Sequence, residues 1–253
     1  MIKMVVAAWR RPDFTQEQFN ERWGGAHARL VTECARAMGF VRYVQSHKIA
    51  SPELEEFGRS RGWATPSDGL TEVWFDSMES MEAAMASAEG QAASLLLQED
   101  EEKFCNSAKL SAFLAVEHFI FDYARPKNPL KMVVQNYGRS DLTQEQFVAR
   151  WRGQHAKLVT ECSKAMGMVR YVQSEKLPSP DLDEFARSRG WAKPADSLTE
   201  VWWESMEAMN AAMGSPEGQA ASALLQADEQ EFCDSKKLSA FLSAEHVIFD
   251  FTR

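Results

Sequence analysis

The stretch Lys3-Met-Val-Val6, followed by Thr15-Gln-Glu-Gln-Phe19, occurs a second time as Lys131-Met-Val-Val134 and Thr143-Gln-Glu-Gln-Phe147. From residue 3 to residue 125 the first half aligns with the second without a gap, and most aligned positions are identical. The period has the size of an ordinary domain and exceeds the roughly 20–50 residues of a solenoid repeat. The sequence therefore predicts two fused copies of one domain, over residues 1–125 and 131–253, joined by a linker at 126–130.

Each copy shows the same order of predicted elements, which are, in the first copy, strands at 2–9, 40–49, 70–76 and 110–123 and helices at 15–38 and 78–104, with a short helix at 53–60. The second long helix is expected to be interrupted near Gly90. This order, βαββαβ, is that of ferredoxin-like domains. Helices cover one face of such a sheet, and the bare face must be buried elsewhere. We therefore expect an α+β fold in which the sheets of the two copies pack face to face as a dimeric α/β barrel within one chain.

Composition excludes several classes of partner. The 253 residues are 45% hydrophobic and carry a net charge of −9, with no basic cluster on a predicted helix face, so no nucleic-acid partner is expected. No apolar run reaches the roughly 18 residues of a membrane span, and no signal-peptide pattern is present. We expect no membrane partner and a cytoplasmic location.

The cysteines give no sign of a metal site or a disulfide framework. They form two equivalent pairs, Cys34 with Cys162 and Cys105 with Cys233, and none has the CxxC spacing. We expect buried thiols. P-loop, dinucleotide and zinc motifs are also lacking, so no metal and no cofactor are expected.

Two motifs resemble those of a known family. The run Trp23-Gly-Gly-Ala-His27-Ala-Arg-Leu30 resembles the first-helix signature of EthD-domain proteins, and Asp68-Gly-Leu-Thr-Glu72-Val-Trp74 resembles their third strand. Both recur in the second copy, although Ser197 replaces Gly69, which would disturb a tight turn there. The resemblance implies the dimeric α/β-barrel superfamily, whose members include polyketide cyclases, dehydratases, decarboxylases, lactone isomerases and haem-handling enzymes.

His27 and its equivalent His155 are the first candidates for catalysis. Helical spacing places His27 on the side of the helix that carries the buried residues. An imidazole facing the space between helix and sheet can act as a general acid or base near neutral pH. The alternative is a histidine that only fixes the helix through a hydrogen bond.

Mid-strand polar residues are the next candidates. Tyr43 and Tyr171 could donate a hydrogen bond to a substrate carbonyl or enolate, or could simply be core aromatic residues. Glu72 and Glu200 could orient the histidine or act as a base with a raised pKa, or could pair with an arginine. Each glutamate shares its strand face with a tryptophan.

A third group of candidates would contact the substrate. In the long segment after the second strand, an arginine could meet a carboxylate and a tryptophan could close the pocket. The histidines of the last strand could instead bridge the barrel interface. The residues expected to bind substrate are Trp9, Asn136, Gln135, Tyr137, Trp74, Trp202, Arg61, Arg189, Trp63, Trp191, His47, His118 and His246.

The two copies differ most at the end of the first strand, where Ala7-Ala-Trp9 becomes Gln135-Asn-Tyr137, and His47 becomes Glu175. These changes predict two unequal pockets. The expected function is that of a cofactor-independent lyase or isomerase (dehydration, elimination, cyclisation or isomerisation) that uses histidine acid/base chemistry on a hydrophobic or aromatic oxygenated small molecule. The alternatives are a non-catalytic small-molecule-binding or stress-associated protein, and a haem-handling protein. Beyond the internal pseudo-dimer, association of intact chains as a further homodimer stays open.

Overall fold

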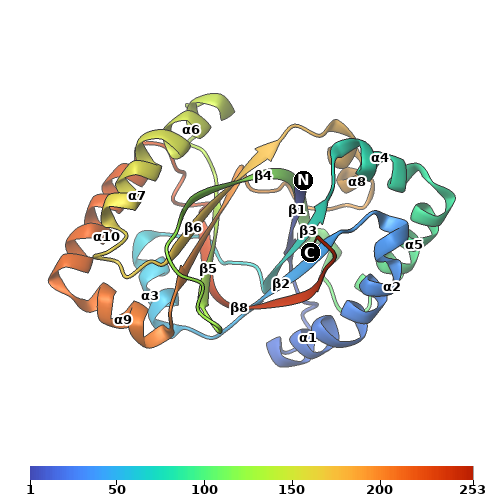
Figure 1. The fold of residues 1–253 in the computed structure, drawn as a ribbon, viewed down its shortest axis with the longest axis horizontal. Helices are drawn as coiled ribbons and strands as arrows, with labels where there is room; N and C mark the ends of the chain where they lie inside the picture. Colours follow the sequence, from blue (N-terminus) through green and yellow to red (C-terminus); the bar gives the residue numbers. More distant parts are fainter. Residues whose placement is uncertain (253) are drawn as a thin grey trace.

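A computed structural model describes residues 1–252 of the chain. The described strands close into one antiparallel barrel in the order β1-β3-β2-β8-β5-β7-β6-β4 (Figure 1). The first copy supplies β1 (Ile2–Ala8), β2 (Arg42–Lys48), β3 (Gly69–Phe75) and β4 (Ser111–Asp122), and the second supplies β5 (Leu130–Asn136), β6 (Arg170–Leu177), β7 (Ser197–Trp203) and β8 (Ser239–Asp250). The predicted α+β fold, a dimeric α/β barrel within one chain, is confirmed.

Two seams join the copies. Strand β4 of the first copy pairs with β6 of the second, and β8 of the second pairs with β2 of the first. Both seams carry a register irregularity, between Phe119 and Phe121 in one and between Tyr43 and Val44 in the other. The bare face of each sheet is thus closed by the other copy, as the ferredoxin-like order of elements requires.

Most helices lie outside the barrel, at opposite sides for the two copies (Figure 1). Their bounds are α1 (Gln16–Arg22), α2 (Ala28–Met38), α3 (Pro52–Arg61), α4 (Met78–Ala86) and α5 (Ala88–Glu101) in the first copy, and α6 (Gln144–Arg150), α7 (Ala156–Cys162), α8 (Pro180–Ser188), α9 (Met206–Gly214) and α10 (Pro216–Glu229) in the second. A 3₁₀ turn spans Ser107–Lys109. In Figure 1, α3 lies beside the helices of the second copy and α8 beside those of the first.

The helix expected at 15–38 is not continuous. Between α1 and α2 the residues Trp23–His27 form a π-helical turn, and Trp151–His155 do the same in the second copy. A π-turn accommodates one extra residue and is frequent at functional sites. It turns Trp23 and His27 inward together, and both are buried. The hydrophobic spacing alone did not indicate this break.

The expected break in the second helix falls at Ser87. This residue ends α4 and caps α5, because its hydroxyl accepts a hydrogen bond of 2.9 Å from the amide of Gly90. A Cβ at Gly90 would lie 1.9 Å from the carbonyl oxygen of Ala84, so only glycine allows the two helices to meet so closely.

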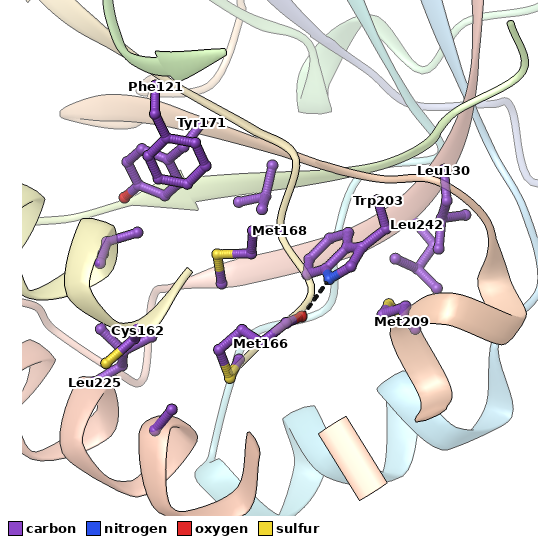
Figure 2. Packing of buried hydrophobic residues seen from close by; sticks show 13 residues of the cluster. Phe121, Leu130, Cys162, Met166, Met168, Tyr171, Trp203, Met209, Leu225 and Leu242 are labelled. Atoms are coloured by element: carbon purple, nitrogen blue, oxygen red, sulfur yellow. Dashed lines mark hydrogen bonds between the residues drawn. The ribbon is translucent and has the colours of Figure 1, made fainter. Parts of the chain in front are cut away.

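Apolar residues pack both inside the barrel and between the sheet and the helices. The inner core includes Val5, Leu70, Phe113 and their equivalents. In the second copy the outer core surrounds Trp203, whose indole nitrogen donates to the carbonyl oxygen of Met166 at 2.8 Å (Figure 2). In residues 1–252, no helix combines the length and the apolar character that crossing a bilayer demands.

Candidate active site

Each copy holds a cavity between its helices and its sheet. In the second copy the cavity measures about 110 Å³ and is lined largely by apolar residues, among them the methionines near Trp203 and Tyr171 (Figure 2). In the first copy an inner cavity of about 80 Å³ shares Glu101 and Trp191 with an outer chamber of about 500 Å³. An engineered cavity of ~150 Å³ holds one benzene ring. The two inner cavities are smaller than this, and the outer chamber of the first copy is larger.

The two copies exchange the residues that close these cavities. Arg61 and Trp63, at the end of α3 in the first copy, line the cavity of the second. Arg189 and Trp191, at the end of α8, line the cavity of the first. Main-chain hydrogen bonds hold both segments across the barrel, from Ala64 to Leu238 at 2.8 Å and from Ala192 to Leu110 at 2.7 Å. Each cavity is therefore complete only when both copies are present.

His27 lines the inner cavity of the first copy and is held by a carboxylate. Its Nδ1 lies 3.0 Å from Oδ2 of Asp100, which also contacts the guanidinium of Arg22. The side chain is 6% exposed, and within residues 1–252 its Nε2 has no hydrogen-bond partner. Burial lowers the pKa of His27, although the bond to Asp100 acts in the opposite direction. The imidazole is thus neutral at neutral pH, with Nδ1 carrying the proton and Nε2 available as a base.

His155 repeats this arrangement in the second copy. Its Nδ1 lies 2.9 Å from Oδ2 of Asp228, and Arg150 donates to Oδ1 of the same carboxylate at 2.5 Å. Burial lowers the pKa of His155 as well. The structure therefore brings the first sequence-predicted residues, His27 and His155, to equivalent positions, each oriented by an aspartate that follows in α5 or α10.

Tyr43 and Tyr171 line the same cavities from the floor of the sheet. The hydroxyl of Tyr43 accepts a hydrogen bond of 3.0 Å from Nε2 of Gln45. Burial raises the pKa of Tyr43 to about 12 and also raises that of Tyr171. Both phenols therefore keep their proton and can donate it as a hydrogen bond to an oxygen in the cavity.

Glu101 and Glu229 are cavity residues that the sequence analysis missed. Burial raises the pKa of Glu101 to about 7, against the opposing charge of Arg189, whose guanidinium lies 3.1 Å from Oε2. Burial likewise raises the pKa of Glu229 to about 7. A carboxyl with that pKa can give or take a proton near neutral pH. Each follows its aspartate directly, as Asp100-Glu101 and Asp228-Glu229, and this repeated acidic pair was the available signal.

Glu72 and Glu200 do not approach the histidines, and the expectation that they orient them is wrong. Strand alternation turns them into the barrel, where they bind neither His27 nor an arginine but the ammonium groups of Lys3 and Lys131. The histidines take their carboxylates from the helices instead. Trp74 and Trp202 share this inner face, and the indole nitrogen of Trp74 donates to Glu117 at 2.7 Å.

The two lysines and two glutamates form a closed ring of charges inside the barrel. Lys3 lies 2.7 Å from Glu72 and 2.8 Å from Glu200, and Lys131 lies 2.6 Å from both. Glu117 and Glu245 complete the ring from β4 and β8. Burial opposes the charged lysines, but the carboxylates outweigh it and hold the pKa of Lys3 and Lys131 above the usual value.

This ring links the copies and leaves no room for a cation. Lys3 of the first copy binds Glu200 of the second, and Lys131 binds Glu72 in return. The oxygens of Glu72, Glu200 and Glu245 lie within 4.8 Å of one another, as metal ligands would. Ammonium groups already occupy the space between them, so we assign this cluster a structural role.

The three residues that differ at the end of the first strand have three different surroundings. Asn136 replaces Ala8 in the cavity lining, and its amide donates to Thr199 at 3.0 Å. Gln135 points into the barrel and accepts a bond from Ser239. Neither Trp9 nor Tyr137 lines a helix–sheet cavity of the described residues; Trp9 lies under the ammonium of Lys109 and Tyr137 packs against the inner core. Asn136 is therefore the one change of the three that alters a pocket.

The remaining histidines lie at the two seams. At one seam His47 stacks on Trp23 and lies 4.4 Å, between ring centroids, from His246. Burial and this second imidazole lower the pKa of His47 to about 4. At the other seam, His118 of the first copy lies 3.1 Å from Glu175 of the second. His118 therefore bridges the two copies, which is one of the two roles expected for it.

Gly69 is needed for packing and not for a turn. It lies inside β3, and a Cβ at this position would lie 2.4 Å from the ring of Trp23. The second copy has Ser197 here, and its hydroxyl accepts a bond from Asn136 at 3.2 Å. The expected disturbance of a turn is therefore wrong, because both residues lie in extended strands.

The fold and the two cross-closed cavities define a dimeric α/β-barrel protein in which one chain supplies both halves. The model of the EthD domain matches residues 11–108 and 139–236, and the chain belongs to this family. A comparison with curated proteins gave no match.

Among solved structures, an anthrone oxidase-like protein shows 10% identity over 99% of this chain and 94% of its own, with a TM-score of 0.56. A candidate monooxygenase from Fusobacterium nucleatum shows 5% identity over 98% and 92%, with a TM-score of 0.50. An EthD family protein from Bacillus halodurans shows 21% identity over 47% of this chain and 100% of its own, with a TM-score of 0.33. At these identities the first two structures show a shared fold and nothing more.

Proposed function

We propose that the protein is a cofactor-independent enzyme of the lyase or isomerase type, acting on a small hydrophobic or aromatic oxygenated molecule in the helix–sheet cavities. One observation carries the proposal. Each cavity contains a neutral imidazole fixed by an aspartate, together with a glutamic acid whose pKa is about 7. Pairs of titratable groups with environments of this kind are typical of acid/base catalysis.

The roles follow from the protonation states. Nε2 of His27 accepts the proton from a carbon next to a carbonyl group, and the developing enolate oxygen accepts a hydrogen bond from the hydroxyl of Tyr43. In an elimination, Glu101 donates its proton to the departing hydroxyl, which leaves as water. In an isomerisation, the proton returns to a different carbon. His155, Tyr171 and Glu229 take the same roles in the second copy.

The proposal can be tested before the natural substrate is known. Acetophenone is a small aromatic ketone, and a base that removes a proton from its methyl group will exchange that proton for deuterium in heavy water. We expect the protein to accelerate this exchange, as measured by proton NMR. The rate should rise with pH as His27 and His155 lose their proton, below the usual histidine pKa. Acetophenone carries no leaving hydroxyl for Glu101 or Glu229 to protonate, so the rate should level off once both histidines are neutral.

The variant Glu101→Gln/Glu229→Gln separates the acid from the base. These amides cannot protonate a departing hydroxyl, but the exchange has none, so the variant should keep the wild-type exchange rate. A profile that simply follows hydroxide concentration would reject the enzyme. Acetophenone binding without any exchange would instead indicate a non-catalytic binding protein, and a Soret band after haem titration would indicate haem handling.

A further inference from the structure

Among the described residues, one buried cation of the second cavity, Arg61, is only loosely paired with a carboxylate. The side chain of Arg61 is 11% exposed and lies against the ring of Phe57, 4.2 Å from its centroid. Its guanidinium donates to the hydroxyl of Ser222 at 3.1 Å. The carboxylate of Glu229 is 3.8 Å away, which is beyond hydrogen-bond distance. A guanidinium has five N–H donors, and within residues 1–252 Arg61 forms one hydrogen bond, to the neutral hydroxyl of Ser222.

The equivalent residue of the other copy is differently paired. Arg189 is similarly buried, at 12% exposure, and donates to Oε2 of Glu101 at 3.1 Å. Burial is therefore the same at the two positions, and the difference lies in the carboxylate. In the first cavity the charge of the arginine is satisfied from within the protein, and in the second it is satisfied only in part.

Burying a charge without a bonded partner is unfavourable, and the effect is visible at Arg61. Burial lowers the pKa of Arg61 more than the charge of Glu229 raises it. An anion that entered the cavity and bound Arg61 would offset the unfavourable free energy of burying its charge. A carboxylate fits best, because its two oxygens match the fork of a guanidinium.

The rest of the cavity indicates what the carboxylate would be attached to. Its walls are formed by the methionines and aromatic residues of the outer core, including Met132, Met166, Met168 and Trp63. Thioether sulfurs and aromatic rings favour an aromatic body. Asn136, which takes the place of Ala8 of the first copy, adds a polar group to this wall.

We propose that the cavity of the second copy binds a small aromatic carboxylate through Arg61, whereas the cavity of the first copy, where Arg189 is paired with Glu101, prefers uncharged molecules. This inference rests on the proposed function only in that it names the ligand class of one of the two proposed sites. The two pockets of the fused chain therefore differ in the charge of the molecule they accept.

The test compares two probes of the same shape, 4-ethylbenzoate and 4-ethylbenzamide, by isothermal titration calorimetry on the full chain. We expect the wild-type protein to bind the benzoate more tightly. Arg61→Gln should weaken benzoate binding by about 10- to 100-fold, the effect of losing hydrogen bonds to a charged group, and leave the benzamide affinity unchanged. Arg61→Lys should show an intermediate loss, because the charge remains but the fork is gone.

Arg189→Gln is the matched variant, and it should not weaken the binding of 4-ethylbenzoate. Equal benzoate affinity of the wild type and Arg61→Gln would overturn the inference, as would an equal loss in Arg189→Gln. A wild-type urea midpoint for Arg61→Gln shows that the variant is intact, whereas a lowered midpoint together with lost benzoate binding would assign Arg61 a structural role instead. Because these titrations involve no turnover, a failure of the exchange reaction with acetophenone would reject the proposed enzyme and leave the result on Arg61 standing.

Discussion

The two faces of the same barrel sheet both bury charged groups, but they use them differently. On the inner face, Lys3 is surrounded by three carboxylates, none more than 3.1 Å away. On the outer face, Nε2 of His27 has no partner in the described residues, and Arg61 is only partly paired. Buried charge by itself therefore does not indicate an active site in this molecule. A buried group with an unfilled hydrogen-bonding position beside a cavity does.

This contrast predicts that changes to the inner face act on stability. Lys3→Met leaves the buried carboxylates of Glu72 and Glu200 without one of their two ammonium groups. We expect a loss of about 3–5 kcal/mol in the free energy of unfolding, measured by urea denaturation. In the fraction that stays folded, exchange of acetophenone should proceed at the wild-type rate. A destabilisation below 1 kcal/mol, the scale of an exposed ion pair, would contradict the assigned role of the ring.

Changes to the outer face should act on the rate. In Asp100→Asn/Asp228→Asn the amide no longer holds the proton of His27 and His155 on Nδ1, so Nε2 is not reliably the free base. We expect the exchange rate to fall by about 10²-fold or more, by analogy with other histidine–carboxylate pairs. The imidazole tautomers, read from nitrogen NMR shifts, should change at the same time. A lower rate with unchanged tautomers would show that Asp100 and Asp228 act in another way.

A smaller effect on the free energy of unfolding is expected at Gly69, where strand β3 packs against Trp23. Gly69→Ala would place a Cβ against the ring of Trp23, which precedes His27 in the π-turn. Overpacking of this kind costs about 1–3 kcal/mol of stability, to be measured by urea denaturation. The matched change Ser197→Ala removes only a hydroxyl and should cost less. Equal costs would mean that Trp23 moves aside freely.

The sequence predicted the architecture because the repeat and the strand periodicity determine it together. The strands lie within two residues of their expected bounds at most ends, and the buried face of each sheet had only one partner of the right shape, the other copy. His27, Tyr43 and the closing pair Arg61 and Trp63 were also found to line cavities. Polar and large aromatic residues are unusual at the positions that these residues occupy, so they could be identified as candidates from the sequence.

What the sequence did not predict depends on contacts between distant segments. Strand alternation gave the face shared by Glu72 and Trp74 but not which side that face turns to. The exchange of α3 and α8 between copies has no local signature, since the two segments are nearly identical. Lys3 was overlooked, although a lysine within an apolar strand is a sign of buried pairing. The π-turn was missed because the spacing of Trp23, Ala26 and Leu30 also fits an uninterrupted 3.6-residue pattern.

The most direct test of the account is the rate of deuterium exchange into acetophenone by the variant His27→Gln/His155→Gln at neutral pH. The account predicts a rate at least about 10²-fold below that of the wild type, because the base is gone from both cavities. His118→Gln/His246→Gln, which changes two histidines that do not line these cavities, should keep the wild-type rate. An unchanged rate in His27→Gln/His155→Gln would contradict the claim that chemistry takes place on the outer face of the barrel.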